Sequence, residues 1–303
     1  MNAVCTITTR SHLHKVYALA DSLQTHDVSL FVLLLDDLSE GITHPTHLDS
    51  KVEWIRLRDL DSEKVAACIQ KYGRISDELR WALKPLFLKF VCQKKTKVCY
   101  VDNDICFYES SDVIFEKLTD YQILLTPHFY PHTPELKGAN WFEANFQVGI
   151  YNAGFIGVRN DAIDFLDWWS HCCLYDMRKS YFRGLFDDQK YLDLVPTIFP
   201  SVYVHPKPTW NFAAWNDWYP NIQRKEGKLC IGEDPIVFIH FTPLSLKEFA
   251  NKSNLANDNY AHYLTSLTHY QPGPLTAERK FSKRNIKNYI RFLFWRFLTR
   301  HQH

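Results

Sequence analysis

Residues 98–107 read Val-Cys-Tyr-Val-Asp-Asn-Asp-Ile-Cys-Phe, and this stretch is the strongest indication in the sequence of both the fold and the functional site. An apolar run typical of a buried strand leads directly into two aspartates separated by one residue. In an extended backbone, side chains two residues apart point the same way, so Asp102 and Asp104 can converge on one point. Two oxygen ligands on one side of a divalent cation leave its other side open to phosphate oxygens. The stretch therefore predicts a Mg²⁺ or Mn²⁺ site for a diphosphate; a turn with two solvated aspartates is the alternative.

The first hundred residues alternate between two kinds of pattern. Short β-rich runs and amphipathic helical runs follow one another, with strands expected over 3–8, 28–35, 52–57 and 97–101 and helices over 13–24, 61–72 and 76–93. This alternation predicts a mainly parallel sheet covered by helices on both faces. In such sheets ligands bind beyond the carboxyl ends of the strands, which is where the two aspartates lie.

The rest of the chain is less regular. We expect strands over 148–158, 198–204 and 236–241, helices over 161–176 and 185–195, and a loop rich in Pro and Trp over 205–220. The Pro-Gly-Pro sequence at 272–274 breaks the chain and marks a boundary.

Composition excludes several classes of protein. The 303 residues carry 35 basic and 34 acidic side chains, a net charge of +1, and 46% are hydrophobic, which excludes wholesale disorder and argues against a protein that coats nucleic acid. The eight cysteines include no Cys-x-x-Cys pair, and the N-terminus shows no basic region before an apolar stretch. Reduced thiols and the lack of a signal-peptide pattern predict a cytoplasmic protein that binds no nucleic acid.

Residues 279–303 differ in kind from what precedes them. They carry eight Lys or Arg and no acid, so their charge of +8 leaves residues 1–278 at −7 from the total of +1. On a helix, apolar side chains from Ile286 to Phe297 form one stripe and basic residues gather opposite. We therefore expect a basic amphipathic tail over 275–303 that rests on an anionic membrane, peripheral on the inner face of the cytoplasmic membrane. The alternative is a terminal helix docked on its own domain.

Two further segments could contribute to the site. On the helix expected over 76–93, Arg80 and Lys84 are four residues apart and share a face, so both cations could meet a diphosphate. Downstream, Asn152, Gly154 and Gly157 interrupt an apolar strand, and glycine there indicates close approach of the backbone to something.

Two more polar features follow. Asp187, Asp188 and Gln189 open an expected helix, and His240 ends an expected strand. Each also has a purely structural interpretation, as a capped helix or as a histidine that is hydrogen-bonded in the core.

In order and spacing, these motifs together resemble those of GT-A glycosyltransferases. The resemblance is strongest to glycosyltransferase family 8, the bacterial lipopolysaccharide galactosyltransferases and glycogenin relatives. It covers about residues 1–245. It rests on Asp102-x-Asp104, Asn152-Ala-Gly154, Asp188-Gln189 and the strand-ending His240.

The resemblance implies a nucleotide-sugar donor, most often a UDP-sugar, and a glycan or lipid-linked glycan acceptor such as a polysaccharide precursor. It implies a GT-A, Rossmann-like mixed sheet, mainly parallel and flanked by helices, over residues 1–270, with a nucleotide-sugar-binding half (1–107) and an acceptor half (108–270). The implied roles are metal ligation by Asp102, Asp104 and His240, donor binding by Thr8, Thr9, Arg80, Lys84, Asn103 and Asn152, and catalysis by Asp187, Asp188 and Gln189. Similar enzymes retain the anomeric configuration, with Gln189 then near the reacting carbon.

The sequence departs from the family after the histidine. Phe241-Thr-Pro follows His240 where the family has a small residue and glycine, and no Lys-Pro-Trp segment comes later. We expect the loop over 211–216 (Asn-Phe-Ala-Ala-Trp-Asn) to supply other contacts in the active site; packing of its aromatic rings is the alternative.

The predicted chemistry is transfer of a glycosyl group. Negative charge builds on the leaving diphosphate, and a divalent cation with a nearby Lys or Arg stabilises that charge. If the reaction inverts, Asp187 or Asp188 would serve as general base. A sugar nucleotidyltransferase is a second hypothesis, although residues 8–13 contain no glycine for a phosphate loop. A non-catalytic carbohydrate-binding protein is a third, and it would need no metal.

Overall fold

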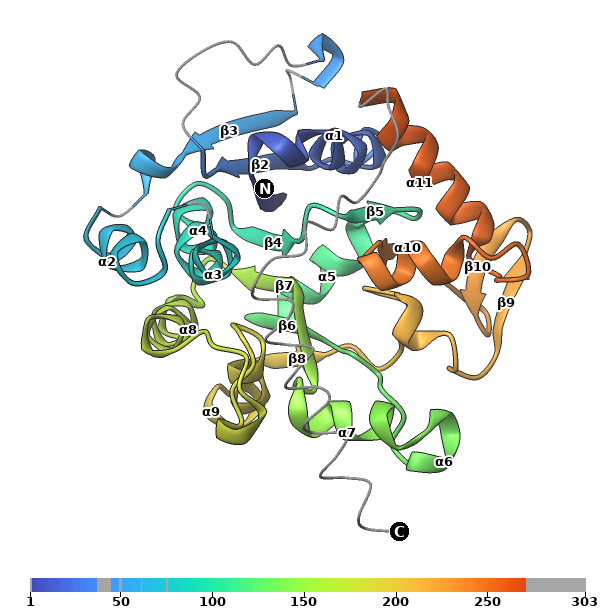
Figure 1. The fold of residues 1–303 in the computed structure, drawn as a ribbon. Coiled ribbons are helices and arrows are strands. Elements are labelled where there is room, and N and C mark those ends of the chain that lie inside the picture. Colours follow the sequence, from blue (N-terminus) through green and yellow to red (C-terminus); the bar gives the residue numbers. More distant parts are fainter. Residues whose placement is uncertain (1, 37–44, 49–50, 61, 75, 271–303) are drawn as a thin grey trace. The chain divides into compact units, whose positions relative to one another are not determined.

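The computed structural model describes residues 2–36, 45–48, 51–60, 62–74 and 76–270, all of which belong to one compact unit. Its centre is a seven-stranded sheet (Figure 1). In spatial order the strands are β3 (Val52–Arg56), β2 (Ser29–Leu34), β1 (Asn2–Thr8), β4 (Lys97–Val101), β7 (Tyr151–Arg159), β6 (Ile123–Pro127) and β8 (Val202–Val204).

Most neighbours in this sheet run parallel. The pairs β3–β2, β2–β1, β1–β4 and β6–β8 are parallel, and only β7 runs antiparallel to its neighbours β4 and β6. Strands such as β1 and β4 are buried on both faces, which explains why their sequences are almost continuously apolar. The prediction of a mixed, mainly parallel sheet flanked by helices is confirmed.

Helices cover both faces of the sheet, and successive residues of β1 contact opposite layers. The α-helices of the described residues are α1 (Leu13–Ser22), α2 (Ser62–Tyr72), α3 (Asp77–Ala82), α4 (Lys84–Cys92), α5 (Asp112–Asp120), α6 (Pro134–Lys137), α7 (Ala139–Gln147), α8 (Ile163–Tyr175), α9 (Val195–Ile198), α10 (Pro243–Phe249) and α11 (Asn257–Tyr270). Ala3, Cys5 and Ile7 pack in a core with α2, α3, α4 and α8, whereas Val4 packs in a second core with α1 and α5. Short 3₁₀ helices span Arg10–His12, Thr46–Leu48, Leu57–Asp59, Tyr181–Arg183, Lys190–Leu194 and Ala214–Asn216.

Two small antiparallel sheets complete the unit. Strand β5 (Ile105–Phe107) pairs with β12 (Phe238–His240), and β9 (Ile222–Lys225), β10 (Lys228–Ile231) and β11 (Asp234–Pro235) form a meander. In the β5–β12 pair Ile105 lies opposite His240. The histidine is thereby carried to the end of β4, next to the two aspartates.

Four expected elements differ in the structure. The strand predicted over 198–204 is shorter, because α9 extends to Ile198 and β8 begins at Val202. The helix predicted over 76–93 is divided at Leu83 into α3 and α4, because Pro85 has no N–H to donate to the helix. The strand predicted from residue 148 begins at Tyr151, since α7 extends to Gln147. The helix predicted over 185–195 is wrong for its first half: Asp187 has φ +41°, which is incompatible with a right-handed helix.

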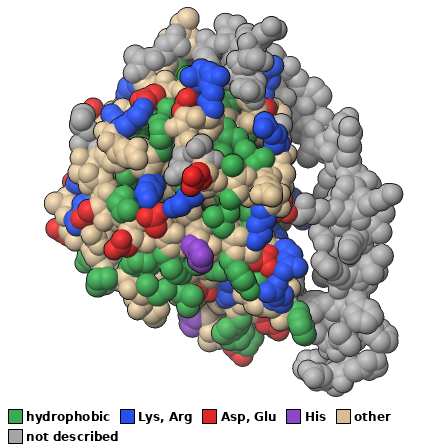
Figure 2. All heavy atoms as spheres, turned by 90° about the vertical axis from the view of Figure 1, so that its left-hand side faces the viewer, with side chains coloured by type: hydrophobic (Ala, Val, Ile, Leu, Met, Phe, Trp, Pro, Cys, Tyr) green, Lys and Arg blue, Asp and Glu red, His purple; other side chains and the backbone are tan. Residues whose placement is uncertain are grey.

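Charged side chains of both signs are interspersed on the face that carries α2, α8 and α9 (Figure 2). For example, Asp167 of α8 lies 2.8 Å from both Lys64 of α2 and Lys89 of α4. This mixed face agrees with the nearly neutral composition.

The basic amphipathic tail predicted over 275–303 lies outside the described residues, so that prediction and the predicted domain boundaries remain predictions. Among the helices that the structure describes, none combines the length and the apolar character needed to cross a membrane.

Candidate active site

Asp102, Asp104 and His240 come together at the end of β4. Each offers one ligand atom, and these three atoms all lie within 4.8 Å of one another. His240 Nε2 is 3.1 Å from Asp104 Oδ1 and 3.9 Å from Asp102 Oδ2. Two carboxylates and an imidazole are a donor set that fits a divalent cation. The three residues that the sequence predicted as metal ligands therefore form one cluster.

The hydrogen bonds behind His240 fix its tautomer. Asn211 donates from Nδ2 to Thr126 Oγ1 (3.1 Å) and to Asn152 Oδ1 (3.0 Å), so its Oδ1 is left to accept from His240 Nδ1 at 3.1 Å. The proton of the neutral imidazole is then on Nδ1, and the lone pair of Nε2 faces the two aspartates. An outer hydrogen bond of this kind is typical of metal-binding histidines.

Asn152 links this network to a second histidine. Its Oδ1 accepts from Gly154 N (2.8 Å), and its Nδ2 donates to His128 Nε2 (2.9 Å). His128 in turn donates from Nδ1 to the carbonyl of Gly149 at 3.0 Å. Burial lowers the pKa of His128 to about 4, so the ring is neutral. Asn152, predicted to bind the donor, is thus a buried residue that orients Asn211.

The two glycines of β7 make different close contacts. A Cβ on Gly154 would lie 2.5 Å from both His240 Cε1 and Asn152 Oδ1, whereas a Cβ on Gly157 would lie 2.8 Å from Leu124 Cδ1. The close approach expected from the sequence is therefore to the histidine of the cluster at Gly154, and to an ordinary core side chain at Gly157.

Lys84 is a buried cation between two carboxylates. Its Nζ lies 3.0 Å from Asp188 Oδ2 and 3.5 Å from Asp102 Oδ1, and donates to the Ala153 carbonyl at 2.9 Å. Burial opposes its charge, but Asp102 and Asp188 outweigh burial and raise the pKa of Lys84, so it stays protonated. Burial raises the pKa of Asp188 to about 7, an effect that Lys84 opposes.

Arg80 approaches the cluster from α3. Its Nη2 lies 3.2 Å from Asp77 Oδ1. Although burial opposes its charge, Asp102 contributes most to raising the pKa of Arg80, followed by Tyr100 and Asp77. Although the helix breaks at Leu83 between them, Arg80 and Lys84 both lie beside the site, and Lys84 is the more deeply buried of the two.

Asn103 fastens the turn between the aspartates to the end of β1. Its Nδ2 donates to Thr8 Oγ1 (3.2 Å) and to the Ile7 carbonyl (3.4 Å). Thr8 is fully buried, while Thr9 is half-buried with its Oγ1 3.0 Å from His12 Nδ1. Thr8 and Asn103, both predicted to bind the donor, therefore contact each other directly.

The three predicted catalytic residues do not share one environment. Asp188 joins the ion pairs of Lys84, whereas Asp187 Oδ2 lies 3.1 Å from Lys179 Nζ. Gln189 donates from Nε2 to the Val148 carbonyl at 3.2 Å. The backbone turns at Asp187, where φ is positive, and the three side chains therefore point to different partners.

The sequence did not single out two residues that contact the aspartates. Lys15 Nζ lies 3.5 Å from Asp104 Oδ2, and Tyr100 donates its hydroxyl to Asp102 Oδ1 at 2.8 Å. Burial would raise the pKa of Asp104, yet Lys15 and His240 hold it below its usual value. Lys15 lies in an ordinary amphipathic helix, and no sequence pattern distinguishes it from a solvated lysine.

The loop over 211–216 combines the two roles expected from the sequence, contact with the site and packing of aromatic rings. Asn211 hydrogen-bonds His240, and Trp215 lies edge-on to the same imidazole at 5.8 Å between ring centroids. Phe212, by contrast, stacks on Phe249 in the core. The loop both contacts the site and packs aromatic rings.

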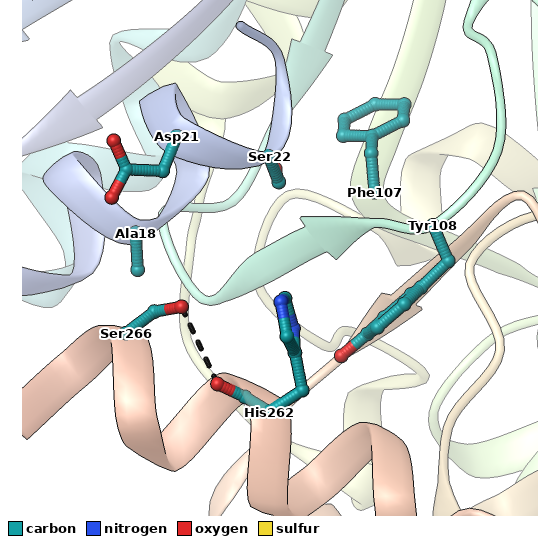
Figure 3. A pocket seen from close by; sticks show the side chains of 7 residues that line it. All are labelled: Ala18, Asp21, Ser22, Phe107, Tyr108, His262 and Ser266. Carbon is teal, nitrogen blue, oxygen red and sulfur yellow. Dashed lines mark hydrogen bonds between the residues drawn. The ribbon is translucent and has the colours of Figure 1, made fainter. Parts of the chain in front are cut away.

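A separate hollow of about 300 Å³ lies between α1, the end of β5 and α11 (Figure 3). Several of its polar side chains hydrogen-bond within the protein; for example, Ser266 donates to the His262 carbonyl at 3.3 Å. The lining includes no residue of the Asp–Asp–His cluster. It consists of Ala18, Asp21, Ser22, Phe107, Tyr108, His262 and Ser266.

Comparison with solved structures identifies the architecture. Over 88% of this chain and 96% of the other, the structure superimposes on an active-site mutant of LgtC with a TM-score of 0.51 at 13% identity. Mouse xyloside xylosyltransferase 1, in its apo form, matches 81% of this chain and 99% of its own with a TM-score of 0.50 at 14% identity. The chain has the GT-A glycosyltransferase fold. At these identities the likeness establishes the GT-A fold and leaves family 8 membership open.

Sequence comparison finds relatives that match this chain over most of its length. The chain is 28% identical over 255 residues to the uncharacterized protein YfnF of Bacillus subtilis (strain 168), covering 80% of this chain and 81% of YfnF. It is 27% identical over 256 residues to the uncharacterized protein YfnD of the same organism, covering 80% and 79%. No family model matches the sequence.

Proposed function

We propose that the protein is a metal-dependent glycosyltransferase that transfers a sugar from a nucleotide-diphosphate sugar to a glycan or lipid-linked glycan acceptor. The observation that carries the proposal is the cluster of Asp102, Asp104 and His240, whose ligand atoms lie within 4.8 Å of one another at the end of β4 in a GT-A fold. Ligands of open α/β sheets bind at such strand ends.

The metal in this proposal is Mn²⁺ or Mg²⁺, held by one oxygen of each aspartate and by Nε2 of His240. The imidazole ligand favours Mn²⁺, because Mg²⁺ prefers oxygen ligands. When bound, the ion would act as a Lewis acid for the charge that develops on the leaving diphosphate.

The residues around the cluster support a donor site with fixed charges. Lys84 holds a positive charge beside Asp102 without exposure to water, so its orientation needs no rearrangement during the reaction. Asn211 and Asn152 orient His240 before any ligand arrives. The donor that we propose is a UDP-sugar, as in the family that the motifs resemble.

The stereochemical course belongs to the proposal as well. We favour retention, with Gln189 near the reacting carbon. If the transfer inverts, we propose Asp188 rather than Asp187 as the general base, because burial raises its pKa to about 7. Each of the two carboxylates is paired with a lysine, Asp188 with Lys84 and Asp187 with Lys179.

A screen of UDP-, GDP-, CMP- and dTDP-sugars for Mn²⁺-stimulated nucleotide release tests the proposed reaction. We expect one donor to be cleaved, and Asp104→Asn to reduce the rate at least about a hundredfold, since a catalytic metal contributes several kcal/mol. The matched control is Asp234→Asn, which alters an exposed aspartate paired with Lys207 and should leave the rate unchanged. Metal-independent release, or equal rates in wild type and Asp104→Asn, would contradict the proposal.

We also propose that residues 275–303 bind an anionic membrane and place the enzyme on the inner face of the cytoplasmic membrane. The support is the sequence itself: residues 279–303 carry eight basic side chains, and four of them, Lys283, Arg284, Lys287 and Arg291, gather opposite the apolar stripe. Deletion of 279–303 should abolish binding to vesicles that contain phosphatidylglycerol, with little change in transfer to a soluble acceptor. Equal vesicle binding by both forms would reject this part of the proposal.

A further inference from the structure

Lys15 is a cation at the edge of the active site. It lies in the first turn of α1, the helix that follows β1, and its Nζ is 3.5 Å from Asp104 Oδ2. Its side chain is 21% exposed, so it is partly covered by the protein and still accessible to a ligand. The contact joins residues that are 89 positions apart in the chain, so the fold, rather than local sequence, places this charge at the cluster.

Asp104 directs its two oxygens at different partners. Oδ1 lies 3.1 Å from His240 Nε2, on the side of the candidate metal ligands, whereas Oδ2 faces Lys15. A divalent cation can therefore bind through Oδ1 while Lys15 keeps its contact with Oδ2. The protein would then hold two positive charges on one carboxylate.

Two cations held this close repel each other unless an anion joins them. Lys15 accordingly disfavours a bare divalent ion and favours one that arrives with a negatively charged ligand.

Lys84, which also lies beside the aspartates, is buried and held by several polar contacts. It is only 2% exposed, and its three contacts go to Asp102, Asp188 and the Ala153 carbonyl. Arg80 pairs with Asp77 on its own helix, whereas the partner of Lys15 is an aspartate of the cluster. Of the two lysines that pair with Asp102 or Asp104 in the described part of the chain, Lys15 is the more exposed and is the one that an incoming phosphate can reach.

We propose that Lys15 binds the diphosphate of the nucleotide-sugar donor, on the side of Asp104 opposite His240. The inference rests on the proposed function, because it assumes that a metal–diphosphate complex is the ligand. A lysine ammonium suits this task as a compact point charge that can follow phosphate oxygens as their charge grows.

Calorimetric titration with inorganic pyrophosphate at saturating Mn²⁺ tests the proposal without knowledge of the base or the sugar. We expect Lys15→Met to weaken pyrophosphate binding at least about tenfold, in line with loss of a charge-assisted hydrogen bond. Its affinity for Mn²⁺ without pyrophosphate should be equal to or higher than that of the wild type, because a repelling charge is gone. Lys15→Arg should stay within about threefold of the wild type.

The control is Lys228→Met, which removes an exposed lysine from an ion pair with Glu109 (2.8 Å) and should change neither affinity. Equal pyrophosphate binding by Lys15→Met and the wild type would overturn the inference. So would a parallel loss of Mn²⁺ and pyrophosphate affinity, because Lys15 would then only hold Asp104 in place. Wild-type protein that binds neither Mn²⁺ nor its pyrophosphate complex would reject the proposed function itself, and the role of Lys15 with it.

Discussion

The two aspartates of the cluster lie in contrasting surroundings. Asp102 contacts Lys84 and Tyr100, which are buried in the core, and we call this the inner side of the cluster. Asp104, although itself the less exposed aspartate, contacts the partly exposed Lys15, and we call this the outer side. Each aspartate keeps its other oxygen toward His240. The inner cation is part of the folded core, whereas the outer cation is accessible to a further partner beside Asp104, so the same residue type should have different roles on the two sides.

Replacement of the two lysines should separate these roles most strongly. Lys84→Met leaves Asp188 buried without its cation and should lower the free energy of unfolding by about 3–5 kcal/mol. Lys15→Met should lower it by less than about 1 kcal/mol, because its ion pair is partly exposed. Urea unfolding of both variants measures the difference, and Asp188→Leu added to Lys84→Met should recover part of the loss. Equal destabilisation by the two single substitutions would remove the distinction between the inner and outer sides.

Asn211→Ala tests whether the cluster depends on its outer hydrogen bonds. It removes the acceptor that holds the proton on His240 Nδ1, and should weaken Mn²⁺ binding about 10- to 100-fold. The control Asn145→Ala removes two amide hydrogen bonds to carbonyls, those of Pro131 and Phe142, and should leave Mn²⁺ affinity unchanged. Unchanged Mn²⁺ binding by folded Asn211→Ala would show that His240 needs no orienting partner.

His128 should make the protein sensitive to acid. Its pKa of about 4 in the folded state lies below the unfolded value of about 6.5, so its contribution is complete above pH 6.5 and is lost as the pH falls toward 4. The expected loss between pH 7 and pH 5 is about 2 kcal/mol. His128→Gln should show a correspondingly weaker pH dependence of unfolding than the wild type and than His132→Gln, which alters an exposed histidine. An identical pH dependence in all three proteins would contradict this assignment.

The two glycines of β7 give the smallest and most local test. Gly154→Ala places a methyl group against His240 and should weaken Mn²⁺ binding about tenfold. Gly157→Ala places one against Leu124 and should cost about 1–3 kcal/mol of stability with no change in Mn²⁺ affinity. Equal Mn²⁺ affinity in both variants would mean that close packing at Gly154 does not position the histidine.

Local patterns in the sequence were enough to predict much of the fold. Alternating apolar runs predicted the parallel half of the sheet, and the aspartates after β4 marked the edge at which a site should lie. Pro85 indicates the break between α3 and α4, whereas the amphipathic pattern alone predicts one continuous helix. The turn at Asp187 had no such signal, because a positive φ at an aspartate depends on its tertiary contacts.

The contacts of the site depend on pairings between distant segments. His240 reaches Asp104 only because β12 pairs with β5, and Asn211 reaches Asn152 across 59 positions in the chain. Lys15 and His128 have no distinctive local sequence, and their contacts exist only once the sheet has formed. The residue types of the cluster were therefore predictable, whereas the groups that orient and neutralise it were not.

Electron paramagnetic resonance of the Mn²⁺-loaded protein tests the central claim most directly. We predict one bound Mn²⁺ per chain with spin-echo modulation from a single coordinated histidine nitrogen. His240→Gln should lose that modulation, and Asp104→Asn should lose the bound ion. Absence of tight Mn²⁺ binding, or a nitrogen signal that persists in His240→Gln, would contradict the assignment of these three residues as one metal site.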